Sequence, residues 1–460
     1  MSVGVIILAA GRGTRMETGL AKVLHTAAGR TLLDWVLEAV GMLDPDETSV
    51  VVGVQADEVT SGLAEGIITA VQEPQNGTGH AAMVGLGGFT RVHVIVVVVP
   101  GDMPLIKAET LRGLVERHDQ SAAAATVLTV KLDDPHGYGR IIRLDGDVAA
   151  IVEERDASHE QRSISEVNTS VYVFDGALLA EALEQISNEN DQGEYYLTDA
   201  VCVIVAAGHR VAGFLTDAEE GVGVNTQAQL AEVAAVLRTR INTTLMESGV
   251  WMLDPSRVYI DAGVDVAPRS QIYPDTYLTG DTTVAVGACI GPSVQVHDSV
   301  IGADAMVVHA VLRGAVVGEN SLIGPYTYLR PGTVLAGGTK IGAYVEVKNS
   351  EIGEGSKIPH LSYIGDATIG RDTNIGAATV TVNYDGHKKY RTTIGDRVRI
   401  GSDTMLVAPV MIGDDAYTGA GSVITDDVPE GSLGIERSSQ RNIPGYAERR
   451  RLRAEKESEE

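Results

Sequence analysis

The sequence predicts two domains of different classes: an α/β domain with a mostly parallel sheet, followed by a parallel β-helix. In the first half, strand-like apolar runs alternate with helical stretches, which is the pattern of a parallel sheet covered by helices. In the second half, an apolar residue recurs every six residues, which indicates a coil of short stacked strands. A chain of 460 residues is long enough for each domain to have its own core.

The first half opens with an apolar run of strand length at residues 5–10, which ends in a glycine-rich turn at residues 11–16. A buried strand that leads into such a turn is a common place for a nucleotide phosphate in an open α/β sheet. The turn lacks the Gly-Lys-Ser/Thr end of a P-loop, and Met16 stands where a dinucleotide fingerprint has its third glycine. From the residues alone, a phosphate-binding turn and a purely structural turn both remain open.

Further strands and helices follow in alternation. Strand-like runs at 50–54 and 92–99 alternate with helix-like stretches at 32–42 and 109–119. Asp102 follows the second of these strands, and ligands of such sheets bind beyond the carboxyl ends of the strands. Because Mg²⁺ prefers hard oxygen ligands, this carboxylate is a candidate metal ligand. An aspartate that caps a turn is the alternative.

A stretch between these strands, from Gln72 to Ala81, is rich in amides and glycine. An amide side chain can both donate and accept hydrogen bonds, which matches the imide edge of uracil. Glycines let the backbone approach a flat base closely. By itself the stretch is only a loop.

Residues 227–245 carry apolar side chains at helical spacing, which predicts one long helix that joins the two domains. We therefore expect an α/β domain at 1–228, a helical linker at 229–251 and a β-helix at 252–441. The remaining segment, 442–460, is a run of mixed charge, and we expect it to be a disordered, solvated tail.

The six-residue period defines the second domain. One apolar residue that points inward every six residues, often followed by glycine at a tight corner, describes a coil with three strands per turn. The period is interrupted at 379–393, where residues 383–391 are too polar and basic to line a coil. Loops of solenoids commonly carry binding sites, and a solvated insertion is the alternative. The periodic positions are Ile272, Leu278, Val284, Ile290, Val317, Ile323, Leu329, Leu335, Ile341, Val347, Ile352, Ile358, Ile364, Ile394, Ile400, Leu406 and Ile412.

Composition excludes several classes of protein. A net charge of −26 argues against a broad nucleic-acid surface, which needs basic patches. Cys202 and Cys289 stand in apolar surroundings and are expected to be core residues, not a disulfide or a metal site. The first apolar run is short and has no basic residue before it, and no run of about 18 apolar residues occurs. We therefore expect a cytosolic protein without membrane insertion.

The motifs of the first half resemble those of sugar nucleotidyltransferases, an α/β family with a Rossmann-like, mostly parallel sheet. Leu8-Ala9-Ala10-Gly11-x-Gly13-Thr14-Arg15-Met16, followed by Lys22, is similar to their signature, and Gly101-Asp102-Met103-Pro104-Leu105 is similar to their metal motif. The chain departs from the family at Ala21, where proline is usual, and at Pro100, where a hydroxyl-bearing residue is frequent. The 72–81 stretch, with further matches at 137–141, 151–153, 167–169 and 223–225, resembles UDP-N-acetylglucosamine pyrophosphorylases.

This resemblance implies roles for residues of the first half. Arg15 and Lys22 would neutralise charge on the triphosphate of UTP during transfer. Asp102 and Asn225 would bind Mg²⁺. The nucleotide and the sugar would be bound by Leu8, Ala9, Ala10, Gly11, Lys22, Gln72, Gly77, Thr78, Gly139, Glu153, Asn168 and Asn225.

The second half resembles hexapeptide-repeat acyltransferases, and this resemblance implies a left-handed coil, although parallel crossovers are usually right-handed. Its motifs at 329–332, 345–348, 359–366 and 382–386 are similar to the acetyltransferase half of the bifunctional family that makes UDP-N-acetylglucosamine. The resemblance implies that glucosamine 1-phosphate is bound by Arg330, Lys348, Tyr363, Asn374, Asn383 and Lys389. It implies that acetyl-CoA is bound by Ala377, Asn383, Tyr384, Ser402, Ala420 and Arg437.

His360 lies within one of these motifs and is suited to be the general base, because an imidazole titrates near neutral pH and the attacking amine must lose a proton. The resemblance implies two activities: acetyl transfer to glucosamine 1-phosphate, then uridylyl transfer from UTP to the acetylated product. It also implies a homotrimer that forms through the β-helix. The alternatives are a nucleotidyltransferase whose β-helix serves only assembly or regulation, and a trimeric scaffold without catalysis.

Overall fold

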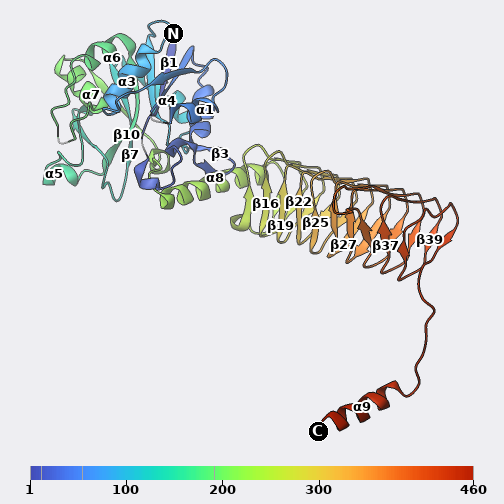
Figure 1. The fold of residues 1–460 in the computed structure, drawn as a ribbon. Coiled ribbons are helices and arrows are strands. Elements are labelled where there is room, and N and C mark those ends of the chain that lie inside the picture. The colour runs from blue at the N-terminus through green and yellow to red at the C-terminus, as the bar shows by residue number, and fades with distance from the viewer. Residues whose placement is uncertain (1, 12, 54, 191, 459–460) are drawn as a thin grey trace. The chain divides into compact units, whose positions relative to one another are not determined.

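The computed structural model describes residues 2–11, 13–53, 55–190 and 192–458. The chain divides into two compact units, Met1–Ile241 and Asn242–Glu460, which are considered separately (Figure 1). The first unit is an α/β domain and the second is a coil of parallel strands, as the sequence predicts. Arg12 and Val54, which belong to the predicted turn and to a predicted strand, lie outside the described residues.

The main sheet of the first unit has the strand order β11-β7-β10-β6-β1-β4-β5, and β8 and β9 form a hairpin beside β10. All neighbours along the main path pair in parallel except at β10, which is antiparallel to both β6 and β7. The sheet is therefore mostly parallel, with one reversed strand near its middle. Its strands are β1 (Val3–Ala9), β4 (Glu47–Val52), β5 (Ile68–Val71), β6 (Ile95–Pro100), β7 (Ala125–Lys131), β8 (Arg140–Leu144), β9 (Asp147–Val152), β10 (Glu166–Asp175) and β11 (Val211–Leu215); β2 (Thr26–Ala27) and β3 (Arg30–Thr31) form a separate pair.

Helices cover both faces of this sheet. Because side chains alternate along a strand, Ile6 and Val98 face one helical layer while Ile7 and Val97 face the other. The first layer contains α3, α6 and α7, and the second contains α1 and α4. The helical elements are η1 (Thr14–Met16), η2 (Lys22–Leu24), α1 (Leu32–Gly41), α2 (Ala56–Thr60), α3 (Thr78–Gly87), α4 (Ala108–Ser121), α5 (His159–Arg162), α6 (Gly176–Leu183), α7 (Leu197–Ala206), η3 (Ala218–Gly221) and α8 (Gln227–Glu247).

The long helix predicted for 227–245 is α8. Its apolar residues Val233 and Leu237 are buried with Met16 and Leu105, so its first part is packed into the core of the first unit. In the second unit, the Asn242 side chain of α8 donates hydrogen bonds to the carbonyls of Pro255 (2.9 Å) and Val258 (3.0 Å). The division between the units thus falls within this helix, not at its ends.

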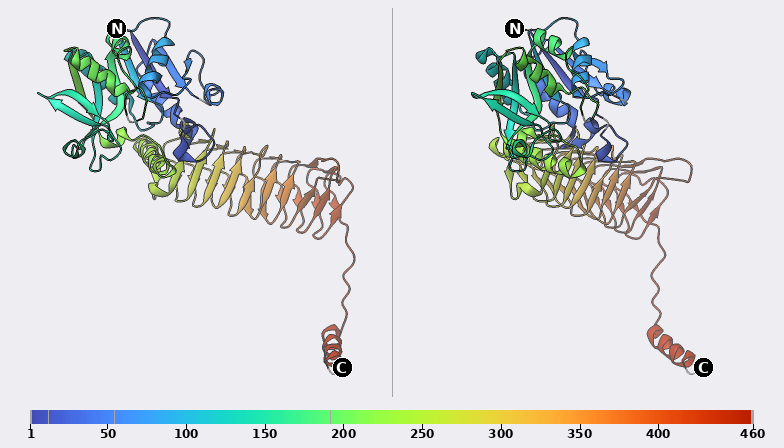
Figure 2. Two further views of the ribbon diagram at one scale, coloured as in Figure 1. Left: turned by 60° about the vertical axis from the view of Figure 1, so that its left-hand side comes forward. Right: turned by 90° about the vertical axis from the view of Figure 1, so that its left-hand side faces the viewer.

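The second unit is a β-helix whose three parallel sheets each take every third strand (Figure 2). One sheet contains β12 (Trp251–Met252), β15 (Gln271–Ile272), β18 (Cys289–Ile290), β21 (Met306–Val307), β24 (Leu322–Ile323), β27 (Lys340–Ala343), β30 (Lys357–His360), β33 (Asn374–Ile375), β36 (Arg399–Ile400), β39 (Tyr417–Thr418) and β41 (Leu433–Gly434). The next contains β13 (Val258–Ile260), β16 (Thr276–Thr279), β19 (Val294–His297), β22 (Ala310–Arg313), β25 (Thr327–Leu329), β28 (Glu346–Lys348), β31 (Tyr363–Gly365), β34 (Val380–Val382), β37 (Met405–Val407) and β40 (Val423–Ile424). The third contains β14 (Asp265–Val266), β17 (Thr283–Val284), β20 (Val300–Ile301), β23 (Val316–Val317), β26 (Val334–Leu335), β29 (Glu351–Ile352), β32 (Ala367–Ile369), β35 (Thr392–Ile394) and β38 (Val410–Ile412); the short helix η4 (Pro255–Arg257) precedes β13.

The six-residue period corresponds to the interior of this coil. All the periodic Ile, Leu and Val positions are buried, as the prediction of inward-facing side chains requires. The interruption at 379–393 is a loop at residues 383–391, between β34 and β35. The stack continues on both sides of it, because β31 pairs with β34 and β32 pairs with β35. The loop is therefore an insertion at a corner and does not break the coil.

The C-terminal segment differs from the expected disordered tail. Residues Tyr446–Glu457 form helix α9, and none of its residues is buried. Ala, Arg, Leu, Glu and Lys favour helix, and Arg453 pairs with Glu457 one turn later at 3.0 Å. Among the described residues, no helix has the length and apolar character needed to cross a bilayer.

Candidate active sites

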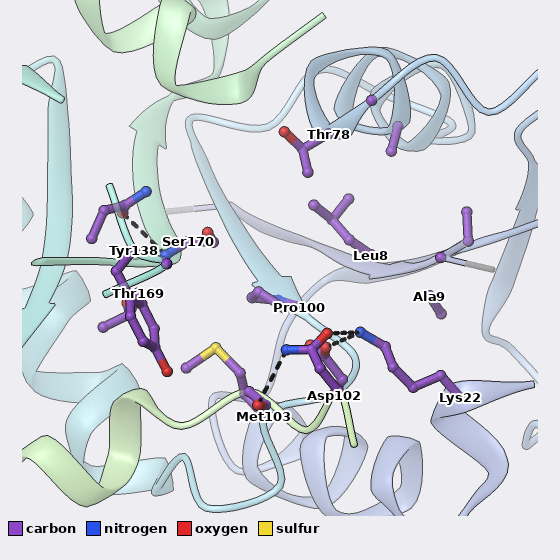
Figure 3. Close-up of a pocket in the computed structure, with 18 of the residues that line it drawn as sticks. Leu8, Ala9, Lys22, Thr78, Pro100, Asp102, Met103, Tyr138, Thr169 and Ser170 are labelled. Atoms are coloured by element: carbon purple, nitrogen blue, oxygen red, sulfur yellow. Dashed lines mark hydrogen bonds and ion pairs between the residues drawn. The ribbon is translucent and has the colours of Figure 1, made fainter. Parts of the chain in front are cut away.

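The first unit contains an open cavity of about 800 Å³ beyond the ends of β1 and β6 (Figure 3). Its walls come from segments far apart in the sequence. Every residue of the first unit to which the resemblance assigns a role lines it: Leu8, Ala9, Ala10, Gly11, Arg15, Lys22, Gln72, Gly77, Thr78, Asp102, Gly139, Glu153, Asn168 and Asn225. The fold thus brings the candidate nucleotide, sugar and metal residues to one place.

The glycine-rich turn is shaped by close packing. Gly13 has a left-handed backbone (φ 59°), and a Cβ there would lie 2.8 Å from the Cβ of Lys22. Met16, which stands where a dinucleotide fingerprint has glycine, is buried against Val224 and anchors the turn to the core. Ala21 has φ −56° and ψ 134°, which are values that proline adopts. The loop therefore takes the expected conformation without the family's usual proline.

Two cations and two side-chain oxygens meet on one wall of the cavity. Lys22 forms an ion pair with Asp102, and its Nζ also lies 3.1 Å from Oδ1 of Asn225 (Figure 3). Arg15 donates to the same Asn225 oxygen at 2.9 Å. The backbone N–H of Val224 donates to the carbonyl of Asp102 (2.9 Å), which ties the two oxygen-bearing segments together. The two oxygens converge on one cation, the Lys22 ammonium.

These two oxygens are suitable for Mg²⁺, which prefers carboxylate and amide oxygens and usually keeps water and phosphate ligands as well. No group of three or more His, Cys, Asp or Glu residues in the described part of the chain could hold a metal ion by itself. Asp102 and Asn225 thus fit a metal ion that also takes ligands from a bound phosphate. In this structure the Lys22 ammonium contacts both oxygens.

The candidate base-binding segment is rigid. Gly77 has φ 98°, and a Cβ there would lie 2.6 Å from the carbonyl oxygen of Tyr195. Gln72 is buried and donates from Nε2 to the Gly77 carbonyl at 2.9 Å, which fixes its amide group. The Thr78 hydroxyl accepts a hydrogen bond from the N–H of Leu197 (3.1 Å). The residues expected to contact uracil are therefore held before any ligand binds.

The opposite wall holds the candidate sugar residues. Asn168 donates from Nδ2 to the Tyr172 hydroxyl (2.7 Å), and its backbone N–H donates to the Gly139 carbonyl (2.8 Å). The Thr198 hydroxyl donates to Glu153 at 3.2 Å. Burial raises the pKa of Glu153, although this hydrogen bond opposes the shift. The wall therefore combines amide and carboxylate groups, which suits a sugar with both hydroxyls and an amide.

Several further residues line the cavity, and the sequence motifs assign them no role. Tyr138, Thr169 and Ser170 lie in or beside quoted motifs, but the motifs do not say which of their side chains face the ligand. Gln75 also lines the cavity and donates to the Ala10 carbonyl at 2.6 Å. Burial raises the pKa of Tyr138, and the negative charge of the nearby Asp102 adds to the shift.

In the second unit, the coil itself positions a cluster of cations. Arg330 directly follows β25, and Lys348 is the last residue of β28, the equivalent strand of the next turn, where Val347 pairs with Leu329. Lys389 comes from the 383–391 loop, and the adjacent Lys348 lowers its pKa by hydrogen bonding and by charge repulsion. Arg330 also pairs with Glu346 at 2.8 Å. A concentration of cations in a chain of net charge −26 is a candidate phosphate site.

Tyr363 and Asn383 lie beside these cations. The Nδ2 of Asn383 is 3.4 Å from the Tyr363 hydroxyl, and Asn383 is almost fully buried although it begins an exposed loop. Both side chains fit against Gly365, where any Cβ would collide with the Tyr363 hydroxyl. The sequence motifs assign no role to Gly365. Only glycine fits there, because the Tyr363 hydroxyl and the Asn383 amide occupy the space that a Cβ would need.

His360 belongs to a separate column at a neighbouring corner of the coil. Backbone hydrogen bonds connect successive turns at this corner: Leu361 to Ala343 (2.9 Å), Ala378 to His360 (3.4 Å), Asp403 to Ala377 (2.7 Å) and Gly421 to Ser402 (2.9 Å). Arg437 continues the column by donating to the Ala420 carbonyl at 2.8 Å. The candidate base thus stands in line with Ala377, Ser402, Ala420 and Arg437, four of the candidate acetyl-CoA residues.

The remaining candidates lie outside these two groups. Tyr384 is exposed on the 383–391 loop, where its hydroxyl donates to the Gly386 carbonyl (2.6 Å). Asn374 is on β33, in the same sheet as His360. Within the described ranges, no hydrogen bond or ion pair joins His360 or Asn374 to Arg330, Lys348 or Lys389. The candidates of the second unit thus form two groups, with Tyr384 and Asn374 outside both.

Comparison with known proteins agrees with the division of the chain into an α/β unit and a β-helix. Residues 5–199 match the MobA-like NTP transferase domain, and residues 314–349 and 391–426 match the bacterial transferase hexapeptide model of six repeats. The repeats identify the coil as the left-handed β-helix of hexapeptide proteins. Among solved structures, UDP-glucose pyrophosphorylase complexed with UDP-glucose is similar at a TM-score of 0.44 and 15% identity, covering 52% of this chain and 100% of that one.

Curated relatives are similar along almost the whole chain. The "Bifunctional protein GlmU" of Streptomyces coelicolor is 50% identical, covering 97% of this chain and 94% of the relative. Proteins of the same name from Corynebacterium aurimucosum and Desulfitobacterium hafniense are each 47% identical, and they cover 97% and 96% of this chain. Because the likeness spans both units and both candidate sites, this chain belongs to the GlmU family of bifunctional proteins.

Proposed function

We propose that this protein is a bifunctional enzyme of UDP-N-acetylglucosamine synthesis. The second unit transfers an acetyl group from acetyl-CoA to glucosamine 1-phosphate. The first unit then transfers uridylyl from UTP to N-acetylglucosamine 1-phosphate and releases pyrophosphate. The observation that carries this proposal is that each unit contains a separate set of matching side chains: the Lys22, Asp102 and Asn225 group in one, and the Arg330, Lys348 and Lys389 cluster in the other.

In acetyl transfer, the cation cluster of Arg330, Lys348 and Lys389 binds the phosphate of glucosamine 1-phosphate. Tyr363, Asn374 and Asn383 orient the sugar, and the column from Ala377 to Ala420, with Tyr384 and Arg437, binds acetyl-CoA. His360 takes a proton from the amine as its nitrogen attacks the thioester carbonyl. The C–S bond breaks, and coenzyme A leaves as the thiol after it gains a proton.

In uridylyl transfer, a phosphate oxygen of N-acetylglucosamine 1-phosphate attacks the α-phosphorus of UTP, and the bond to the pyrophosphate leaving group breaks. Arg15 and Lys22 neutralise charge that builds up on the phosphates. Gln72, Gly77 and Thr78 hold the uracil, while Gly139, Glu153 and Asn168 hold the sugar. Asp102 and Asn225 would hold Mg²⁺, which supplies charge neutralisation and alignment of the phosphates when bound.

We also propose that the protein is a cytosolic homotrimer that forms through its β-helix. The separation of His360 from the cation cluster supports this, because a neighbouring subunit could complete each acetyltransferase site. We propose the cytosol because the enzyme would need UTP and acetyl-CoA as co-substrates, and both must be present where it acts.

The experiment measures thiol release from acetyl-CoA with glucosamine 1-phosphate, comparing the wild type with His360→Ala. We expect turnover in the wild type and a fall of roughly 10²–10⁴-fold in the variant, the usual contribution of a general base. Uridylyl transfer should be unchanged in the variant. Absence of wild-type turnover would mean that the β-helix serves only assembly, and that the protein is a pyrophosphorylase alone.

A further inference from the structure

Asp366 is a buried carboxylate in the candidate acetyltransferase site to which no role has yet been given. It follows β31 at a corner of the coil, with a left-handed backbone (φ 52°). Only 8% of its surface is exposed. Such burial is unfavourable for a carboxylate unless its oxygens are satisfied by donors or cations.

Three side chains satisfy this carboxylate. Asn349 donates from Nδ2 to Oδ1 at 2.6 Å, and Asn383 donates from Nδ2 to Oδ2 at 2.5 Å. The Lys348 ammonium lies 3.6 Å from Oδ2. Asn349, Asp366 and Asn383 are spaced 17 residues apart, which is one turn of the coil at this point. The stacking of the coil therefore places the three side chains in register.

The carboxylate is ionised in this environment. Burial by itself would raise its pKa, but the hydrogen bonds from Asn349 and Asn383 and the charges of Lys348 and Lys389 together lower the pKa of Asp366 below its ordinary value. A carboxylate whose pKa is lowered in this way carries its negative charge beside the candidate phosphate site, 3.6 Å from the Lys348 ammonium.

Asp366 also connects both ends of the 383–391 loop to the coil. Its side chain holds Asn383 at the start of the loop, and its carbonyl accepts a hydrogen bond from the N–H of Thr392 just after the loop (3.1 Å). The loop closes on itself where Tyr390 donates to the Asn383 carbonyl (2.8 Å). Asp366 therefore holds both ends of the loop that carries Lys389, and Thr368 holds it as well by accepting a hydrogen bond from Arg391 (2.8 Å).

The hydrogen bond to Asp366 decides which face Asn383 presents to a ligand. An amide group has one acceptor oxygen and one donor nitrogen. Because Nδ2 of Asn383 is committed to the carboxylate, its Oδ1 is the atom left to accept a hydrogen bond from a sugar hydroxyl or amine. A neutral residue at 366 would allow the amide to turn over.

We propose that Asp366 is a positioning residue of the acetyltransferase site, which sets the orientation of the Asn383 amide, the location of the Lys348 ammonium and the attachment of the 383–391 loop. It acts through these residues and does not itself contact the amino sugar. This inference rests on the acetyl transfer proposed above.

The test is Asp366→Asn in the full-length protein. Asparagine has the same shape and tolerates a left-handed backbone, but it lacks the charge and carries its own donor. We expect the KM for glucosamine 1-phosphate to rise roughly ten- to hundredfold, which corresponds to one lost hydrogen bond to a charged group. Calorimetric binding of glucosamine 1-phosphate should weaken by the same factor. The KM for acetyl-CoA should rise by a smaller factor, because Asn383 is only one of the six candidate acetyl-CoA residues. The uridylyl transfer rate should stay within about twofold of wild type, the scale expected of sites without shared partners.

Two further variants complete the design. Asp304→Asn is the matched control, because Asp304 is an exposed aspartate at another left-handed corner (φ 55°), and it should leave both KM values unchanged. Asn349→Gly removes one donor to Asp366 while tolerating the positive φ at that position (45°), and it should raise the same KM by a smaller factor.

The outcomes separate this inference from the proposed function. Wild-type thiol release together with an unchanged KM for glucosamine 1-phosphate in Asp366→Asn would overturn the positioning role alone. Equal increases in both KM values, or a similar response in Asp304→Asn, would also overturn it, because these indicate a general structural effect. Absence of wild-type thiol release would instead refute the acetyl transfer itself.

Discussion

At the scale of single residues, the first site has a cation where a metal is proposed. The ammonium of Lys22 contacts both Asp102 and Asn225, and Arg15 donates to the same Asn225 oxygen. In the proposed uridylyl transfer, the charge of a bound triphosphate would give these two cations a better partner. The oxygens of Asp102 and Asn225 would then be available to hold Mg²⁺. Lys22 is thus proposed to neutralise phosphate charge and to occupy the two oxygens otherwise.

Replacement of Lys22 by alanine tests this double role. We expect Lys22→Ala to lower kcat/KM for uridylyl transfer by roughly 10²–10³-fold, as for other preorganised electrostatic groups. Acetyl transfer should be largely intact, because Lys22 belongs to the first unit and the candidate acetyltransferase residues belong to the second. Coupled assays of pyrophosphate and thiol release on one preparation give both rates. A parallel loss of the two activities would contradict separate sites.

Glu153 gives a prediction about stability and pH. Burial raises its pKa, so as pH falls the folded chain takes up this proton before the unfolded chain does. Ionised Glu153 therefore destabilises the fold at neutral pH, and this cost disappears as pH falls through its raised pKa toward the ordinary value. We expect Glu153→Gln to raise Tm at pH 8 by roughly 2–4 °C, which corresponds to about 1 kcal/mol in a unit of this size.

Thermal unfolding at pH 8 and pH 5 would check this prediction. The difference in Tm between Glu153→Gln and wild type should shrink at the lower pH, where the wild-type glutamate begins to protonate. Uridylyl transfer should be weaker in the variant at both values, because one acceptor for the sugar is lost. A larger Tm difference at pH 5 than at pH 8 would refute the assigned pKa shift.

At the scale of elements, short segments are positioned by close packing of backbone. Gly77, just before α3, shows this most clearly, because its positive φ and its contact with the Tyr195 carbonyl leave no room for a side chain. The 383–391 loop is positioned differently, by hydrogen bonds from an otherwise unbroken coil. Both segments carry candidate ligand contacts on a rigid support.

The Gly77 position can be tested against a matched glycine. Gly66 has a similar φ of 93°, but nothing lies within 4 Å of the Cβ that it would gain. We expect Gly66→Ala to cost only the backbone strain, about 1–3 kcal/mol. Gly77→Ala should cost more and should also raise the KM for UTP, because the turn must move. Equal losses of Tm and equal KM values for the two variants would show that the turn does not hold the base.

An element of the fold could be predicted from the sequence where a local residue pattern determines it. The coil was predictable because every turn repeats its inward apolar positions, and the buried residues agree with that pattern. The reversed direction of strand β10 could not be predicted, because it depends on long-range pairing with β6 and β7. The helix at 446–457 was missed because mixed charge favours both solvation and helix.

The site shows the same distinction. Candidate residues such as Gln72 and Asp102 lie in recognisable motifs, and the fold gathers them around one cavity. Tyr138 and Gln75 were not assigned, because a motif does not show which side chains face inward. Asp366 could have been found from its 17-residue spacing to Asn349 and Asn383, once the length of a coil turn was known.

At the scale of the whole molecule, each of the two compact units contains one candidate site, and the chain passes from one unit to the other within α8. The chain thus carries two reactions whose product and substrate are the same acetylated sugar phosphate. Because the residues of each site come from one unit, substitutions in one should not affect catalysis in the other. In the proposed trimer, the acetyltransferase site would also need residues of a neighbouring chain.

The assembly can be measured directly. Multi-angle light scattering of the purified protein should give a mass three times the 48.5 kDa of one chain. Dilution that releases monomers should reduce thiol release more than uridylyl transfer, because only the acetyltransferase site is proposed to need a neighbour. A fully active monomer would refute the shared site.

The column of backbone hydrogen bonds from His360 to Ala420 spaces its residues at regular intervals along the coil. Neighbouring strands of a sheet are roughly 4.8 Å apart, so the three steps from His360 through Ala377 and Ser402 to Ala420 cover roughly 14 Å. In the proposed acetyl transfer, acetyl-CoA would lie along this column with its thioester at His360. The number of turns would then set the distance between the thioester and the far contacts, and adding or removing one turn would change that distance by one strand spacing.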